Sequence, residues 1–321
     1  MFPTLRNRLL IAGTLLMGAW VWVSALSALR TGDGTDSPTL ITAHGGVAAA
    51  LLAVVVAGIP AIALSIVCAA GGNPLSGVFA VTTCLWMMAA NGESIEPWLR
   101  RDGGSLPADY YKLIVEMILW AILVTGFIVL SHTLRPALQK KVPMLAREHH
   151  LGEGTTVAMP DVPTLASAAI AAVFAGVLAF FLLRHAAVGQ VVGALMAAFL
   201  VGTMTGDLAC SFLLAKRPTN AVRVVLAPVI VAVVAYLMAA MGYSDREQFL
   251  QALFSGKLPG LALALPIHYA GAGIAGACLG AGAAQVILAG DKAEKKVAAP
   301  LATPVILAGK TSSPTADKSN G

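Results

Sequence analysis

Residues 164–183 read TLASAAIAAVFAGVLAFFLL, an apolar run of twenty residues without a charged side chain. A helix on the surface of a water-soluble protein has an apolar stripe and a polar face. This run is apolar all round, so its natural surroundings are lipid or other buried helices. Twenty apolar residues in a helix also suffice to cross about 30 Å of hydrocarbon. The run therefore predicts a membrane span.

The composition extends this prediction to the whole chain of 321 residues. Apolar residues make up 58% of the chain and charged residues only 12%, with a mean hydropathy of +0.81, whereas a soluble domain carries roughly 25% charge. The apolar runs are continuous, whereas strands of a membrane barrel alternate apolar and polar residues. We therefore predict an all-α, polytopic transmembrane helix bundle with about eight spans. The predicted spans are Arg8–Leu29, Gly45–Ala70, Leu75–Gly92, Tyr111–Ser131, Thr164–Leu183, Ala186–Ala215, Ala221–Tyr243 and Leu258–Ala289.

Two of these spans have special features. Residues 71–74 read GGNP, a strong turn signal that predicts a tight hairpin between the second and third spans. The last run is too long for one upright span, and Pro259 and Pro266 predict a break, with the main span starting near Ile267. The stretch Arg246–Lys257 mixes apolar and polar residues, which favours a short helix at the membrane interface.

The first span has an alternative interpretation as a cleaved signal peptide. Arg6 and Arg8 precede it, and Ala25-Leu26-Ser27 resembles a cleavage site. Its apolar core, residues 9–29, is longer than the roughly 7–15 residues of a signal peptide. An uncleaved anchor is therefore the favoured interpretation.

The distribution of basic residues predicts the orientation of the bundle. Lysine and arginine number 14 on one side of the predicted spans and 7 on the other. By the positive-inside rule, we expect both termini in the cytoplasm. We also expect the protein in the cell (inner) membrane. The same rule explains the pI of about 9.1 without nucleic acid, which we exclude as a partner. The richer side holds Arg6, Arg8, Arg135, Lys140, Lys141, Arg147, Lys216, Arg217, Arg223, Lys292, Lys295, Lys296, Lys310 and Lys318.

The longest polar segment between spans divides the chain. We expect a first four-span half in residues 1–131, a cytoplasmic connecting loop in 132–163, a second four-span half in 164–289 and a disordered cytoplasmic tail in 290–321. A parallel duplication of the two halves is an open alternative. It rests on matches at an offset of 144, from Gly45, Val47, Ala50, Leu51, Ala53, Gly58 and Pro74 to Gly189, Val191, Ala194, Leu195, Ala197, Gly202 and Pro218.

Asp207, inside the sixth predicted span, is the first candidate for a ligand or ion site. A carboxylate in hydrocarbon is costly, so it faces water or a partner. One interpretation is an ion or proton site, and the other is a carboxylate that is wetted or paired near the cytoplasmic end. Ala198, Gly202, Gly206 and Cys210 beside it are spaced by four and predict a ridge for close helix packing.

Four further polar residues in the predicted spans are candidate ligand or ion residues: Gln190, His268, Gln285 and Glu116. Glu116 lies four residues after Lys112, so an interfacial ion pair between them is the alternative to a site. A single histidine such as His268 is more often a hydrogen-bonded structural residue than a ligand.

The last span contains Gly276 and Gly280 in a G-x-x-x-G pattern, which favours close helix packing within the chain or between subunits. No strand precedes these glycines, so they are not a dinucleotide fingerprint. The non-cytoplasmic loop before the fourth span is a candidate binding surface, with anchoring at the interface as the alternative. Its candidate residues are Glu93, Glu96, Trp98, Arg100 and Arg101.

No sequence pattern predicts a metal, a cofactor or a catalytic site. Cys68, Cys84, Cys210 and Cys278 all lie in apolar runs without zinc-site spacing, so they are interpreted as small packing residues. Three classes of function remain. The favoured one is a non-catalytic scaffold or subunit of a membrane complex, with the bilayer and other membrane subunits or further copies of the chain as partners. The alternatives are a transporter or channel for a small solute or ion, and an intramembrane enzyme acting on a lipid-like substrate.

Overall fold

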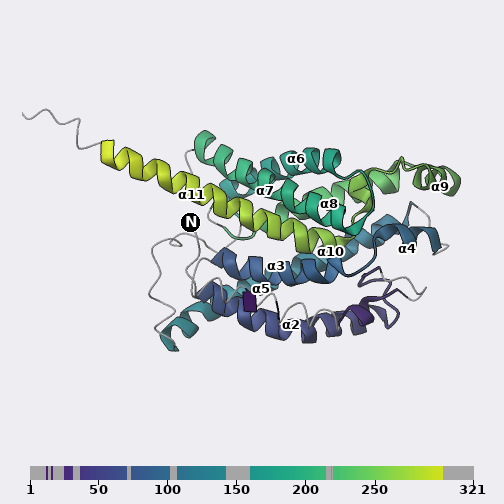
Figure 1. Ribbon diagram of the computed structural model, residues 1–321, viewed down its shortest axis with the longest axis horizontal. Coiled ribbons are helices and arrows are strands. Elements are labelled where there is room, and N and C mark those ends of the chain that lie inside the picture. The colour runs from purple at the N-terminus through teal and green to yellow at the C-terminus, as the bar shows by residue number, and fades with distance from the viewer. Residues whose placement is uncertain are drawn as a thin grey trace, which may run out of the picture. The chain divides into compact units, whose positions relative to one another are not determined.

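The computed structural model describes residues 12–13, 16, 25–31, 37–70, 74–101, 107–141, 160–214, 218 and 220–298. Within these ranges the protein is all-α, with ten α-helices, α2 to α11 (Figure 1). Residues up to Ala284 form one compact unit and residues from Gln285 onward form another, and each is described by itself.

Among the residues that the structure describes, six helical stretches are long and apolar enough to cross a membrane. They are α2 (Gly46–Ala70), α5 (Asp109–Lys141), α6 (Val162–Leu182), α7 (Val188–Leu213), α8 (Arg223–Met241) and the stretch from Pro266 to Ala289. Each matches one predicted span, so the chain is a multi-pass helical membrane protein. The third predicted span forms α3 (Pro74–Ala90), whose 17 residues are short for a span. The first predicted span lies mainly outside the described residues, so the count of eight and the orientation stay predictions.

The last span is broken where its prolines predicted a break. Helix α9 (Arg246–Phe254) is followed by the 3-10 helix η3 (Gly260–Leu263), and α10 (Pro266–His268) starts at the second proline. The chain then passes through the π-helical turn η4 (Tyr269–Gly273) into α11 (Ile274–Ala298). Proline lacks the N–H that a helix interior needs and is well placed at a first turn.

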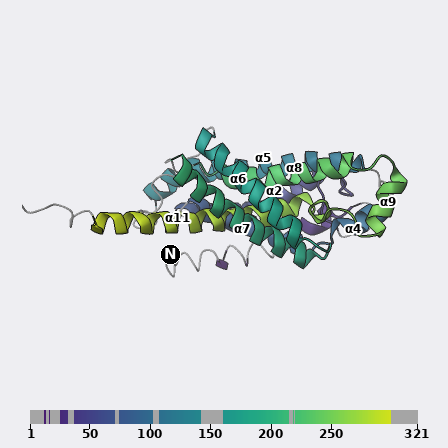
Figure 2. The same cartoon turned by 90° about the horizontal axis from the view of Figure 1, so that it is seen from above.

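The π-helical turn lies between two groups of helices. Helices α6, α7 and α8 pack together, as do α2, α3 and α5, and α5 also packs against α8 (Figures 1 and 2). All five residues of η4 are buried, and this turn contacts α3, α5, α7 and α8. The start of the last span is therefore the central packing element of the described bundle.

Three local features differ from the sequence-based expectations. Helix α5 continues ten residues beyond the predicted end of its span, so the connecting segment begins as helix. Part of the predicted external loop forms the short helix α4 (Ile95–Arg101). The duplication left open as an alternative would align α2 and α3 with α7 and α8; α7 packs mainly against α6, whereas α2 packs closely against α3.

Candidate functional site: buried polar groups of the bundle

Asp207 lies at the meeting point of three helices. Its Oδ1 accepts hydrogen bonds from Ser167 Oγ on α6 at 2.6 Å and from Arg223 Nε on α8 at 3.0 Å. Its Oδ2 accepts from Arg223 Nη2 at 3.1 Å, which makes a two-nitrogen, charge-assisted contact. Arg223 Nη1 donates to the carbonyl of Asn220 at 2.7 Å. The side chains of the ion pair are only 3% and 1% exposed, so both charges are buried and paired.

Arg223 is a functional residue that spacing alone did not single out. The sequence-based prediction counted it among the basic residues on the cytoplasmic side and included it in the span Ala221–Tyr243. In the structure it is the first residue of α8 and is buried inside the bundle.

Small residues bring α7 close to its neighbours. A Cβ added to Gly206 would lie 2.5 Å from the carbonyl oxygen of Ser167, and one added to Gly202 would lie 2.7 Å from that of Ala171. Only glycine allows this approach of two helix backbones. The same close packing holds Ser167 beside Asp207.

The glycines of the last span face the same helix α7. A Cβ at Gly276 would lie 2.3 Å from the carbonyl oxygen of Met196, and one at Gly280 would lie 2.2 Å from that of Leu200. The G-x-x-x-G pattern thus packs within the chain in this structure.

Glu116 has other partners than the one predicted. Lys112 binds Asp109 at 2.7 Å instead of Glu116, so the expected ion pair is wrong. Glu116 is 1% exposed, and its carboxylate accepts from Trp120 Nε1 at 3.3 Å and from the backbone N–H of Ile41 at 3.4 Å.

Three buried tyrosines hold the non-helical part of the last span. Tyr110 donates to the carbonyl of Ala262 at 3.1 Å and Tyr236 to that of Ala264 at 2.6 Å. Tyr269 donates to the carbonyl of Leu261 at 2.9 Å. Their rings are in contact, tilted for Tyr110 and Tyr236 with centroids 5.9 Å apart, and edge to face for Tyr236 and Tyr269 with centroids 6.1 Å apart. Buried carbonyls outside a regular α-helix need such partners, and no sequence pattern indicated them.

The remaining candidate ligand residues do not gather around Asp207. Gln190 lies on the same helix seventeen residues earlier, which places it about 25 Å away along the axis, and it donates to the carbonyl of Leu182. His268 is fully buried, its Nδ1 accepts from the N–H of Leu265 at 2.9 Å, and its Nε2 has no hydrogen-bond partner among the described residues. Gln285 lies in α11, in the second unit.

The external-loop candidates are described only in part. Glu93 is exposed and Glu96 is half-buried in α4. The side chains of Trp98, Arg100 and Arg101 lie outside the described residues. This loop therefore stays a predicted surface.

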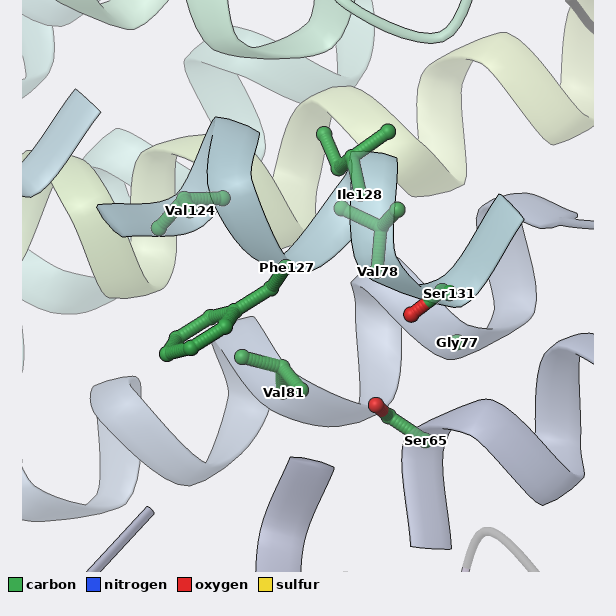
Figure 3. Close-up of a pocket in the computed structure, with 8 residues that line it drawn as sticks. All are labelled: Ser65, Gly77, Val78, Val81, Val124, Phe127, Ile128 and Ser131. Atoms are coloured by element: carbon green, nitrogen blue, oxygen red, sulfur yellow. The ribbon is translucent and has the colours of Figure 1, made fainter. Parts of the chain in front are cut away.

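A small pocket lies among α2, α3 and α5 (Figure 3). It has room for about one water molecule and is mostly apolar, with the hydroxyls of Ser65 and Ser131 as its polar groups. Ser65 Oγ donates to the carbonyl of Ile62 on its own helix. In the described residues, no three His, Cys, Asp or Glu side chains are placed to hold a metal ion.

The buried ion pair and the tyrosine hydroxyls described above can hold neighbouring helices together and hold the broken start of the last span inside the bundle.

Comparisons with protein-family models, with curated proteins and with solved structures find no match to this chain.

Proposed function

We propose that this membrane protein is a non-catalytic scaffold or a subunit of a membrane complex in the cell (inner) membrane. The observation that carries the proposal is the Asp207–Arg223 ion pair, which Ser167 completes across three helices. A carboxylate used for transport has to exchange its partner for an ion or a proton. Asp207 instead has both oxygens bound by side chains of its own chain.

The outward faces of the bundle support the same role. Helix α6 exposes Val173, Phe174, Val177 and Phe181. Apolar side chains of this kind are suited to lipid and to the apolar faces of other membrane subunits. The bundle thus offers a rigid interior, fixed by ion pairing and glycine contacts, and an apolar exterior.

The test is purification of the tagged chain in mild detergent, followed by quantitative mass spectrometry and measurement of the mass of the complex. We expect a partner subunit, or a further copy of the chain, in fixed stoichiometry. A monodisperse single chain without any stoichiometric partner contradicts the proposal.

The double variant D207L/R223M makes this test specific to the role of the ion pair. Replacing a buried ion pair with apolar residues of similar size is often neutral or stabilising, whereas breaking it is costly. If the pair only fixes helices, the double variant keeps the complex intact. Loss of the complex in a variant that folds and is monodisperse shows that the charges themselves are needed.

Transport of a small solute or ion is the second candidate, favoured by the broken last span. Discontinuous helices with unwound carbonyls form the substrate and ion sites of many transporters. Here the carbonyls of Leu261, Ala262 and Ala264 belong to such a segment, although tyrosine hydroxyls bind them. The test is flux of ions or labelled solutes into vesicles that contain the purified protein, with empty vesicles as the control.

A further inference from the structure

Two of the buried carboxylates in the described part of the bundle, Asp207 and Glu116, have opposite surroundings. Asp207 has a guanidinium and a hydroxyl within 3.2 Å. Glu116 is equally buried, but its hydrogen-bond donors are neutral N–H groups, among them Trp120 Nε1 at 3.3 Å and the backbone N–H of Ile41 at 3.4 Å. Burying a carboxylate without a cation costs far more than burying a neutral carboxyl group.

The donors of Glu116 belong partly to a folded segment, residues 37–44, which we call the strap. The backbone of Leu40 and of Ile41 hydrogen-bonds to the Glu116 carboxylate. The N–H of Thr39 donates to the carbonyl of Leu29 and that of His44 to the carbonyl of Arg30. Ser37 Oγ donates to the carbonyl of Ser94 at 2.7 Å, next to α4.

The strap is packed down onto the bundle. Ser37, Thr39 and Leu40 are all at most 1% exposed, although they lie in a connection between two predicted spans. Glu116 is 1% exposed and hydrogen-bonds to the strap backbone at Leu40 and Ile41, so the strap is one of the elements that cover it.

Other ionisable groups on the elements that pack against α5 are neutral or remote. Tyr236 on α8 faces Glu116, and Tyr269 and His268 lie on η4 and α10. Cys68 and Cys84 lie on α2 and α3. The charged groups of these elements are Arg223 at the start of α8, about 20 Å from Tyr236 along the axis, and the Asp109–Lys112 pair at the start of α5. At the strap itself, Arg30 and His44 are exposed. None of them supplies Glu116 with a cation.

We propose that Glu116 is a proton-binding site that controls the strap: the closed strap covers a protonated Glu116, and loss of the proton opens it. The neutral carboxyl group is compatible with burial among N–H donors and tyrosines. The carboxylate that remains after the proton leaves needs water, which reaches it when residues 37–44 lift from the bundle. This inference is independent of the proposed scaffold role.

Hydrogen exchange of the full-length protein in detergent or lipid nanodiscs tests the proposal. The measured quantity is the protection factor of the 37–44 backbone amides, which compares the exchange rate with the intrinsic rate at the same pH. Between about pH 5 and about pH 9, a range in which buried carboxyl groups titrate, we expect protection to fall at least about tenfold as pH rises. Protection that stays constant over this range overturns the proposal.

The matched variants are E116Q and H44Q. Glutamine at position 116 keeps an acceptor oxygen and is neutral at every pH, so the strap should stay protected throughout. His44 is the exposed ionisable residue of the strap, and H44Q should keep the response of the native chain. An E116Q protein with the native pH response, or an H44Q protein without it, overturns the assignment to Glu116.

Infrared spectroscopy of the native chain keeps the proposal testable if E116Q does not fold. A protonated carboxyl group has a C=O stretch distinct from that of a carboxylate. We expect this C=O band at neutral pH in the native protein and also in D207N, which lacks the Asp207 carboxylate. In the native protein we expect the band to disappear at high pH. A native spectrum at neutral pH without the band overturns the proposal.

Discussion

The guanidinium of Arg223 meets the carboxylate of Asp207 edge to edge, with Nε 3.0 Å from one oxygen and Nη2 3.1 Å from the other. Breaking such a buried pair leaves one charge without its partner. We expect R223M and D207L each to lower the free energy of unfolding by about 3–5 kcal/mol, and the double variant to recover most of it. The measurement is thermal or denaturant unfolding in detergent. K112M is the control, because the Lys112 side chain is 52% exposed, and its loss should cost less than that of the buried Arg223 although its partner Asp109 is only 7% exposed. Equal losses in the single and double variants contradict the pairing.

Gly206 faces the backbone of α6 so closely that no side chain fits. We expect G206A to force α6 and α7 apart and to destabilise the protein by about 1–3 kcal/mol. The measurement is the detergent melting temperature. Gly189 and Gly193 on the same helix have nothing within 4 Å of an added Cβ, so G189A and G193A should be neutral or stabilising. A uniform response of all three variants would show that α6 does not pack on Gly206.

Tyr236 holds the carbonyl of Ala264 in the unwound part of the last span. Removal of its hydroxyl in Y236F leaves that buried carbonyl without its donor, at a cost of about 1–3 kcal/mol. We expect lower stability and faster hydrogen exchange in residues 258–268. Tyr111 is about half exposed, and Y111F should change neither quantity. If Y236F exchanges like the native chain, the hydroxyl does not hold the segment.

The orientation of the bundle can be measured directly. In intact cells, a membrane-impermeant maleimide should label S244C and leave K140C unlabelled, because the basic end of α5 is predicted to be cytoplasmic. Permeabilised cells supply the control, in which both positions should react. The reverse pattern would overturn the predicted topology while leaving the helices as they are.

Helix positions could be predicted well because their cause is local. Runs such as residues 164–183 lack charges over a full span length, and the predicted bounds of α6 agree within two residues at each end. The break in the last span was predicted for a similarly local reason, since Pro259 and Pro266 cannot continue a helix. The first predicted span lies mainly outside the described residues. The orientation of the helices in the membrane stays a prediction.

The partners of the buried polar groups could not be predicted, because they lie far apart in the chain. The spacing of four residues suggested that Lys112 pairs with Glu116. In the structure Lys112 forms an ion pair with Asp109, and Glu116 accepts a hydrogen bond from the backbone N–H of Ile41. The sequence showed that a carboxylate at Asp207 would be costly in hydrocarbon. The cation that pairs with it, Arg223, lies on the next helix. Pattern rules describe one helix at a time, whereas these contacts depend on which helices become neighbours.

The central place of Tyr269–Gly273 has a consequence for biogenesis. A ribosome delivers these residues after all the helices that surround them, so α3, α7 and α8 enter the bilayer with their inner surfaces still lacking the turn that fills the space between them. The bundle can therefore reach its final packing only once synthesis has passed Pro266. Until then, its earlier helices depend on lipid or on the insertion machinery to occupy the middle of the protein.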